Sequence, residues 1–135
     1  MRSGWTARLV QVALGLLLFI GGCAVGRQGG MEPTLLHVFA FTPLEGATEQ
    51  DFADFQAATA EMVGQIPGLR RAWFGRLLQP IPNGGGHVRE YGVAMEFDNI
   101  EALRGYADHP AHRAWEQVYA RVRVPGTTTL DIPGE

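Results

Sequence analysis

The stretch "LLHVFAF", Leu35 to Phe41, decides the fold of the domain that it opens. It is rich in aromatic and aliphatic residues, and apart from His37 both alternating sets of positions are apolar, which predicts a strand with two apolar faces. Helices of the same chain can cover one of these faces. The other face then needs a second cover.

The residues after this strand predict a helix. Pro43 and Gly46 mark a turn, and "TEQD", Thr48 to Asp51, has the pattern of a helix-capping sequence. Apolar residues then recur at helical spacing until "IPG", Ile66 to Gly68, ends the pattern. The recurring residues are Phe52, Phe55, Thr59, Met62, Val63 and Ile66.

Two more strands are expected in the middle of the domain. "LRRAWFGRLL", Leu69 to Leu78, predicts the second strand, in which Trp73 and Phe74 are expected to be core or dimer-interface residues. "QPIPNGGG", Gln79 to Gly86, is rich in turn formers and predicts a loop. Between Tyr91 and Phe97 large apolar residues alternate with smaller or polar ones, which predicts the third strand.

The C-terminal part predicts two helical pieces and a last strand. Asp98 or Asn99 is expected to cap a short helix. Pro110, a favoured residue in a first helical turn, predicts a second piece directly after His109. "TTTLDI", Thr127 to Ile132, predicts the fourth strand. The expected buried stripe of the second piece is Ala111, Trp115, Val118, Tyr119 and Val122.

The order of these elements, β-α-β-β-α-β, predicts the α+β class and a ferredoxin-like protomer with a four-stranded antiparallel sheet. The helices should cover one face of the sheet, and the large apolar residues of the other face would remain uncovered. A second copy of the chain is the simplest cover. We therefore expect a homodimer in which two sheets pack face to face as a dimeric α/β barrel.

The N-terminal segment predicts export. Arg2 and Arg8 precede an apolar run, Leu9 to Ile20, of roughly a dozen residues, whereas a membrane-spanning helix needs about 20. The next residues, "IGGC", resemble a bacterial lipobox, in which Cys23 becomes the lipidated N-terminus. An uncleaved membrane anchor and an ordinary secreted protein are the alternatives.

In the lipoprotein interpretation, residues 1–22 are a signal peptide, residues 23–33 are the lipidated cysteine and a flexible tether, and residues 34–135 are the folded domain. The lipid on Cys23 would anchor the protein in the bacterial cell envelope. Ala24, rather than the aspartate linked with inner-membrane retention, favours the outer membrane and its periplasmic face, by resemblance to lipoprotein sorting. A host with one membrane would place the protein on its outer leaflet.

Charge and composition exclude several classes of function. The 11 basic residues are all arginine, so Schiff-base and lysine-nucleophile mechanisms are excluded. Removal of Arg2 and Arg8 would leave nine arginines against 14 acidic residues, a net charge near −5, which makes nucleic acid a poor partner. Cys23 is the only cysteine and would be alkylated, so no disulfide is expected.

Four segments together resemble the stress-responsive dimeric A/B barrel (Dabb) domain family: "HVFAFTPLEGATEQDF", "IPGLRRAWFGR", "EYGVAMEFDNIEAL" and "YADHPAHRAW". The resemblance implies a dimeric α/β barrel and a small-molecule pocket between sheet and helices. In a few plant members a tyrosine and the second histidine of the HPAH segment cyclise a poly-β-keto chain without metal or cofactor, and Tyr106 and His112 match them. His37 matches a cavity histidine of the first strand. Tyr91 stands where many members have another histidine.

His109 and His112 are three residues apart, which a helix could place on one face, but His109 lies at or before the helix start. No zinc or facial-triad pattern accompanies them, so we predict no metal and no cofactor. His109 is expected to cap the last helix by accepting from the N–H of Ala111 or His112. His112 is expected beside Trp115 and bonded to a backbone carbonyl. It could be purely structural, face a ligand, or act as a general base.

These observations predict an envelope-anchored lipoprotein whose domain binds a small, largely apolar ligand that carries oxygen. The expected pocket residues are His37, Tyr91, Tyr106, His112 and Trp115. One alternative is a cofactor-free cyclase, isomerase or monooxygenase, with Tyr106 and His112 as the catalytic acid–base pair. A non-catalytic interaction module of the envelope is the other.

Overall fold

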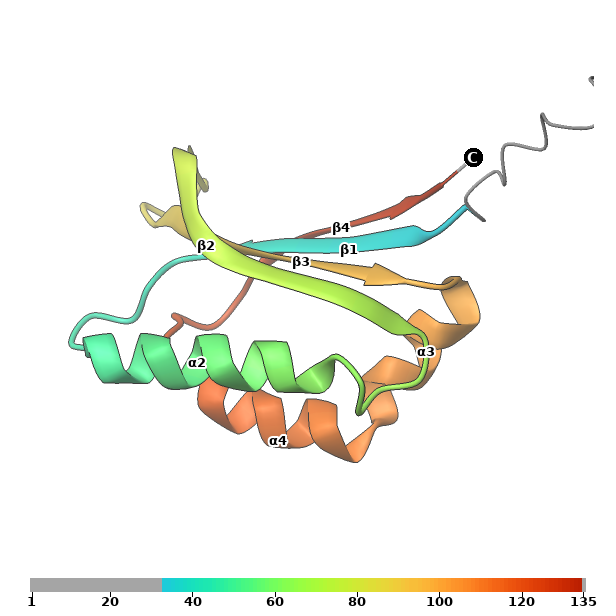
Figure 1. Ribbon diagram of the computed structural model, residues 1–135. Coiled ribbons are helices and arrows are strands. Elements are labelled where there is room, and N and C mark those ends of the chain that lie inside the picture. Colours follow the sequence, from blue (N-terminus) through green and yellow to red (C-terminus); the bar gives the residue numbers. More distant parts are fainter. Residues whose placement is uncertain (1–32, 135) are drawn as a thin grey trace, which may run out of the picture. The chain divides into compact units, whose positions relative to one another are not determined.

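The computed structural model describes residues 33–134, so the predicted signal peptide, Cys23 and nearly all of the predicted tether lie outside the described residues. The described part is one compact unit. None of its helices is long and apolar enough to cross a membrane. Its elements in chain order (Figure 1) are β1 (Leu35–Phe41), α2 (Glu49–Met62), β2 (Leu69–Pro82), β3 (Val88–Phe97), α3 (Ile100–Asp108), α4 (Pro110–Tyr119) and β4 (Thr128–Pro133).

The four strands form one antiparallel sheet in the order β2-β3-β1-β4. The helices lie together on one side of this sheet (Figure 1). The predicted α+β, ferredoxin-like protomer is therefore confirmed. Because β1 lies between β3 and β4, its side chains form the centre of both sheet faces.

The face towards the helices, called here the helix face, holds the core. Phe39 of β1 pairs with Val93 of β3 on one side and with Thr129 of β4 on the other. Phe41 and Phe55 are fully buried, and their rings meet edge to face with centroids 5.8 Å apart. Aromatic pairs of this kind add stability beyond their buried area.

Two of the expected helix starts are confirmed. Thr48 and Asp51 form a reciprocal capping box at the start of α2, and the side chain of Asn99 caps α3. The expected end of α2 was wrong: the helix stops at Met62, and Ile66 is buried in the turn that follows. Gly68 ends this turn with φ of 80°, and a Cβ there would lie 2.5 Å from the Cβ of Ala102, so only glycine fits.

The predicted loop at Gln79–Gly86 was partly wrong, because β2 continues to Pro82. The register of β2 with β3 shifts between Arg76 and Ile81, and Figure 1 shows β2 curving away from the sheet there. β2 is an edge strand, and one of its sides has no neighbouring strand in the sheet. A proline whose missing N–H would point to that side costs no hydrogen bond between strands. The prolines at positions 80 and 82 therefore lie within β2 and do not end it.

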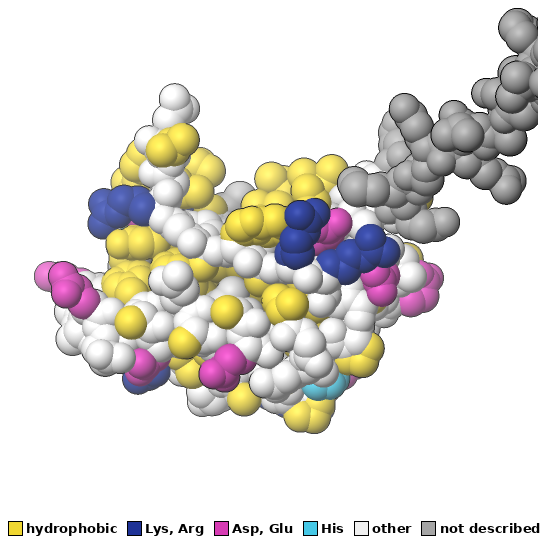
Figure 2. Space-filling view, viewed as in Figure 1, with side chains coloured by type: hydrophobic (Ala, Val, Ile, Leu, Met, Phe, Trp, Pro, Cys, Tyr) yellow, Lys and Arg dark blue, Asp and Glu magenta, His cyan; other side chains and the backbone are white. Residues whose placement is uncertain are grey.

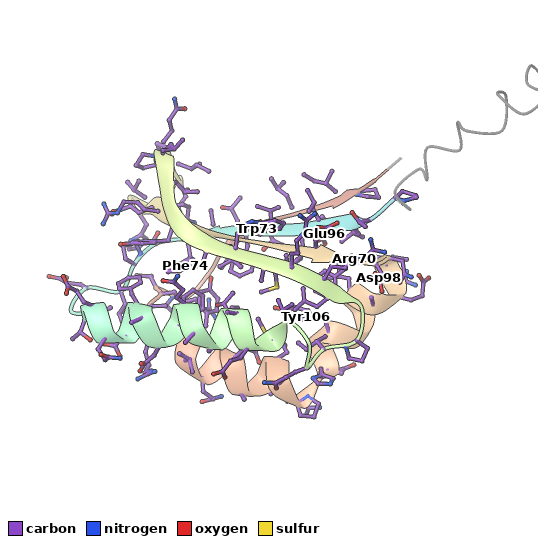
Figure 3. All side chains as sticks on the ribbon, in the orientation of Figure 1. Arg70, Trp73, Phe74, Glu96, Asp98 and Tyr106 are labelled. Carbon is purple, nitrogen blue, oxygen red and sulfur yellow. The ribbon has the colours of Figure 1, made fainter. Side chains whose placement is uncertain are left out.

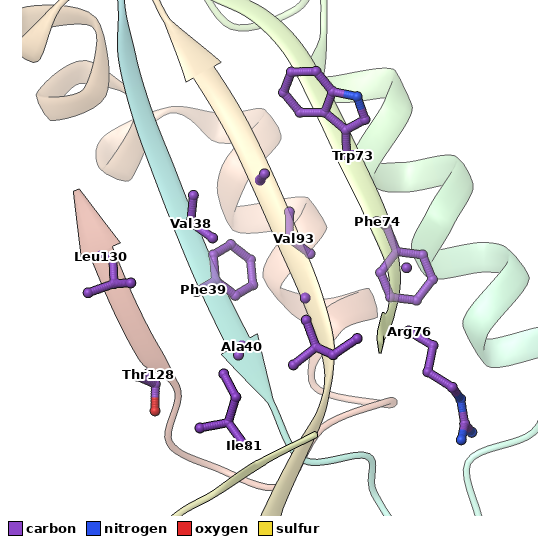
Figure 4. Close-up of a pocket in the computed structure, with 14 residues that line it drawn as sticks. Val38, Phe39, Ala40, Trp73, Phe74, Arg76, Ile81, Val93, Thr128 and Leu130 are labelled. Atoms are coloured by element: carbon purple, nitrogen blue, oxygen red, sulfur yellow. The ribbon is translucent and has the colours of Figure 1, made fainter. Parts of the chain in front are cut away.

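The opposite side of the sheet, called here the open face, is apolar and uncovered within the described chain. One row crosses it from β2 to β4 through Trp73, Ala94, Val38 and Leu130, which pair in that order. Trp73 is 47% exposed and Leu130 is 58% exposed. Figure 2 shows hydrophobic side chains on this side, and Figure 4 shows the hollow of about 390 Å³ that they line.

Trp73 and Phe74 illustrate how β2 separates the two faces. Figure 3 shows the two side chains on opposite sides of the strand, with Phe74 towards α2 and Trp73 away from it. The ring of Phe74 packs edge to face on Phe55 at 4.9 Å. Phe74 thus packs against the core, whereas Trp73 belongs to the surface that we expected a second copy to cover.

Candidate functional site

His37 lies in the middle of β1 and faces the helices. Its Nδ1 is 2.6 Å from Oδ1 of Asp131, its register partner in β4. A carboxylate can only accept, so Nδ1 carries a proton in this bond, and Nε2 is the ring nitrogen left for other partners. The imidazole centroid is 5.9 Å from the ring of Tyr106, which places His37 beside the two candidate catalytic residues.

Tyr106 occupies the last turns of α3 and is 5% exposed. Its ring packs edge to face on Phe97 at 5.2 Å and lies 4.1 Å from the imidazole of His112, centroid to centroid. Burial raises the pKa of the Tyr106 hydroxyl, and the negative charge of Glu116 raises it further. Tyr106 is therefore a neutral phenol at physiological pH and can donate a proton in a hydrogen bond.

His112 is the second histidine of the "HPAH" segment and lies in the first turn of α4, and its orientation is fixed by the backbone. Its Nδ1 is 3.1 Å from the carbonyl oxygen of Ala107. Since a carbonyl only accepts, Nδ1 donates and Nε2 keeps its lone pair. Burial lowers the pKa of His112 below 6.5, although the bond to Ala107 and the charge of Glu116 act in the other direction. The imidazole is thus a neutral base at neutral pH.

Trp115 forms an aromatic side of the same site. It stacks on His112 with ring centroids 5.5 Å apart. Its Nε1 donates to the hydroxyl of Thr59 at 2.9 Å, and that hydroxyl donates to the carbonyl of Phe55 at 2.7 Å. Two successive buried hydrogen bonds therefore hold the indole, and with it the position of the imidazole.

These side chains line a pocket of about 280 Å³ between the helix face and α4. Four of the five predicted pocket residues meet there. The lining consists of His37, Phe39, Tyr106, His112, Trp115, Glu116, Tyr119, Arg123, Thr127 and Thr129. The site thus combines aromatic walls with several polar groups, as small-molecule sites usually do.

Tyr91, the fifth predicted residue, is not among those that line this pocket. It pairs with Phe41, nearer the end of β1 than Phe39. Its ring stacks on Phe52 of α2 at 4.8 Å, and its hydroxyl accepts from Arg76 at 3.1 Å. The position that matches a family histidine therefore contributes to the packing of α2 on the sheet.

Sequence reasoning missed the opposite end of the pocket, formed by Tyr119 and Arg123. Tyr119 was expected only as a buried apolar residue of the last helix. Arg123 lies four residues further on, beyond the end of α4, and its guanidinium lies over the Tyr119 ring at 4.5 Å. Because Arg123 is outside the helix, helical spacing gave no signal for this contact.

His109 has the capping role that the sequence predicted. Its Nδ1 accepts from the N–H of Ala111 at 3.2 Å at the start of α4. Across residues 33–134, no three His, Cys, Asp or Glu side chains gather as a metal site would require. The described arrangement can therefore offer a ligand a neutral base, a phenol and aromatic surfaces.

Residues 35–131 match the sequence model of the stress responsive A/B barrel domain, nearly the whole described chain. The chain belongs to this family. No curated protein is significantly similar to it in sequence. Within the family fold, the pocket described above lies between the sheet and the helices.

Solved structures share this fold at low sequence identity. A dimeric ferredoxin-like protein of unknown function from Jannaschia sp. CCS1 is 20% identical, with a TM-score of 0.60 over 73% of this chain and 97% of its own. A hydroxynitrile lyase from Passiflora edulis is 9% identical, with a TM-score of 0.62 over 77% of this chain and 95% of its own. A cofactor-independent oxygenase from Streptomyces nogalater is 16% identical, with a TM-score of 0.51 over 76% of this chain and 92% of its own.

Proposed function

We propose that this stress responsive A/B barrel domain binds a small, largely apolar ligand that carries oxygen. The observation that carries the proposal is the pocket in which Tyr106 and His112 lie with ring centroids 4.1 Å apart, next to Phe39 and Trp115. The aromatic rings provide apolar contact area, and the phenol and imidazole provide a donor and an acceptor. A volume of about 280 Å³ limits the ligand to a small molecule.

A thermal-shift screen against small aromatic and polyketide-like acids tests this proposal. A ligand at about 100 times its dissociation constant adds ~2.7 kcal/mol of stability, which the method detects. We expect His112→Ala and Tyr106→Phe to reduce the shift. His87→Ala, an exposed histidine, and Tyr91→Phe are the matched controls and should leave it unchanged. Equal shifts in all four variants would remove the site assignment.

A second candidate is cofactor-free catalysis with the same two residues. The bond from His112 to the Ala107 carbonyl leaves Nε2 free to take a proton from a carbon next to a carbonyl, and Tyr106 can donate to the developing enolate. The fold is shared with a hydroxynitrile lyase and a cofactor-independent oxygenase. Turnover should rise with pH through one ionisation below 6.5, since the pKa of His112 is lowered, and disappear in His112→Ala.

We also propose that the domain acts as a homodimer. Relatives of this fold are dimeric, and the open face is an apolar surface that a second sheet would cover. Face-to-face packing of the two sheets would give the dimeric α/β barrel expected from the sequence. If ligands fail to bind while a partner protein is retained by the His112 and Tyr106 variants, the domain is an interaction module instead.

The lipid anchor on Cys23 remains our proposal for where the protein acts. The support is the apolar run Leu9 to Ile20 followed at once by "IGGC". Mass spectrometry of the membrane-extracted protein should find a mature N-terminus at a lipid-modified Cys23, in the outer-membrane fraction of a two-membrane host. Cys23→Ser should release the protein from the membrane. An unmodified cysteine would contradict the anchor without touching the ligand proposal.

A further inference from the structure

Three buried polar atoms in residues 33–134 have no hydrogen-bond partner: Nε of Arg89, Nε of Arg123 and the hydroxyl of Tyr119. Arg89 is only 7% exposed, and its guanidinium has one hydrogen bond, from Nη1 to the hydroxyl of Thr42 at 3.1 Å. Buried polar atoms are nearly always paired in folded proteins. Three unpaired atoms from neighbouring side chains therefore indicate a missing partner.

These groups belong to one place in the molecule. The guanidinium of Arg123 lies over the ring of Tyr119 at 4.5 Å. Burial raises the pKa of Tyr119, and the nearby positive charges of Arg123 and Arg89 oppose that rise. Two guanidinium groups thus act on one buried hydroxyl, and Arg123 and Tyr119 both line the candidate pocket.

The two charges are not neutralised by the described chain. Among residues 33–134, neither Arg89 nor Arg123 forms a salt bridge with an acidic residue. Arg121 shows the contrast, because it pairs with Asp51 at 3.3 Å and with Asp54 at 2.9 Å on the surface. A buried cation without a counter-ion is costly, so this end of the pocket favours a bound anion.

The geometry favours a carboxylate. A guanidinium presents parallel N–H donors that match the two oxygens of a carboxylate, and the Tyr119 hydroxyl can donate a further hydrogen bond. The hydroxyls of Thr127 and Thr129 also line this pocket. Glu116, the acidic residue among those that line the pocket, acts on the pKa values of Tyr106 and His112 and would repel a carboxylate from their end.

We infer that the ligand of this domain is a small carboxylic acid, with its carboxylate on Arg123 and Tyr119 next to Arg89 and its apolar body against Phe39 and Trp115. This inference rests on the proposed ligand-binding function and adds to it a substrate class and a direction. The oxygen-bearing end opposite the carboxylate then lies at Tyr106 and His112, the residues that could act on it.

Matched probes that differ only in the head group test the inference. Calorimetry would compare a series of aryl-alkanoates, beginning with 3-phenylpropanoate, with the corresponding amides on the purified protein. In wild type, the acids should bind at least about tenfold more tightly than the amides, because a charged hydrogen-bonded pair replaces a neutral one. Inorganic phosphate should compete weakly, since it lacks the apolar body.

Variants of the arginines test which residue causes the preference for acids over amides. Arg123→Gln should abolish the preference for the acid while the amide still binds, and Arg123→Lys should restore part of it. Arg89→Gln should reduce the preference, with circular dichroism confirming that the variant folds. Arg121→Gln, two residues from Arg123 but on the surface, should leave the preference unchanged.

Equal binding of acids and amides in wild type would overturn the inference and leave the proposed function intact. An acid preference that survives in Arg123→Gln would also overturn it, because another group would then hold the carboxylate. If no member of either series binds, the proposed ligand-binding function fails together with this inference.

Discussion

The two faces of the sheet use similar residues for different purposes, and two tryptophans show the difference. On the helix face, Trp115 is 4% exposed and its indole N–H is held by Thr59. On the open face, Trp73 is 47% exposed, and the guanidinium of Arg71 lies over its ring at 5.3 Å. The face that the chain covers itself can position polar groups for chemistry. The open face is left uncovered by residues 33–134, and we propose that a second copy covers it.

Charge is distributed between the faces in the same way. The helix face carries His37 and Arg89, and Arg123 lies beside it after α4. The two arginines have no salt bridge to an acidic residue in the described chain. The open face carries Glu96, which is 5% exposed and pairs with Arg71 at 2.5 Å. The hydrogen bond from Arg71 lowers the pKa of Glu96, so the pair stays ionised. A second copy could cover this face without burying a lone charge.

The largest expected effect is a loss of unfolding free energy, and its dependence on protein concentration should differ between the two faces. Phe41→Ala removes a fully buried ring that packs on Tyr119 at 5.1 Å, and it should cost ~3–5 kcal/mol of unfolding free energy at any protein concentration. Val38→Ala on the open face should cost less, and only where the protein is dimeric. Urea unfolding of wild type and both variants at two protein concentrations measures these losses. If the loss relative to wild type changed with concentration equally in both variants, the comparison would be contradicted.

Next in size is the loss of the dimer. Trp73→Glu places a charge on the apolar row of the open face, at its β2 end, and it should weaken self-association by more than 100-fold, roughly 3 kcal/mol. Sedimentation equilibrium would measure the dissociation constant, with far-UV circular dichroism to show that the protomer remains folded. Trp73→Phe is the control and should stay dimeric. A Trp73→Glu protein that still dimerises would mean that another surface forms the interface.

A smaller loss should follow on the helix face when Thr59 becomes valine. The change removes the acceptor of the buried Trp115 N–H at nearly constant volume, so it should cost ~1–3 kcal/mol. Thr59→Ser keeps the hydroxyl and should recover most of this loss. Urea midpoints measure both variants. A Thr59→Val protein as stable as Thr59→Ser would show that the hydrogen bond contributes little.

The smallest effect is a pH dependence on the helix face. Because burial lowers the pKa of folded His112 below 6.5, the unfolded chain binds more protons than the folded one as the pH falls below that value. Unfolding free energy should therefore be constant above about pH 6.5 and decline below it. Glu116 and His37 also act on this imidazole. His112→Gln should flatten the decline in urea midpoints between about pH 5 and pH 7, and an unchanged slope would contradict the assignment.

Local patterns were sufficient to predict most of the fold. Residue composition and, in the third strand, alternation predicted the four strands, and the caps at Thr48, Asn99 and His109 are where the sequence indicated. The extension of β2 to Pro82 was missed because proline normally ends a strand, and only the order of the sheet shows that β2 is an edge. The order of the strands in the sheet depends on contacts between residues distant in sequence, which local patterns do not predict.

Most of the predicted part of the site comes from one segment, and the family resemblance added His37 of β1. Tyr106, His112 and Trp115 come from ten consecutive residues and meet as expected. The cluster at the other end joins Arg89 of β3 to Tyr119 of α4, and their proximity depends on the packing of helix on sheet. Arg89 lies before the strand predicted from Tyr91, and a buried arginine is contrary to the usual preference of this residue for solvent, so the sequence did not indicate its place.

The central position of β1 affects how the protein folds as it is synthesised. Leu36 can pair on both sides only after its register partners, Glu96 in β3 and Ile132 in β4, have been synthesised. Contacts between such distant residues form slowly, because the chain must first close long loops. A nascent chain that stops before Thr128 exposes a full edge of unpaired amide and carbonyl groups on an apolar strand, which favours aggregation. The synthesis of β4 therefore completes the pairing of β1 and removes this exposed edge.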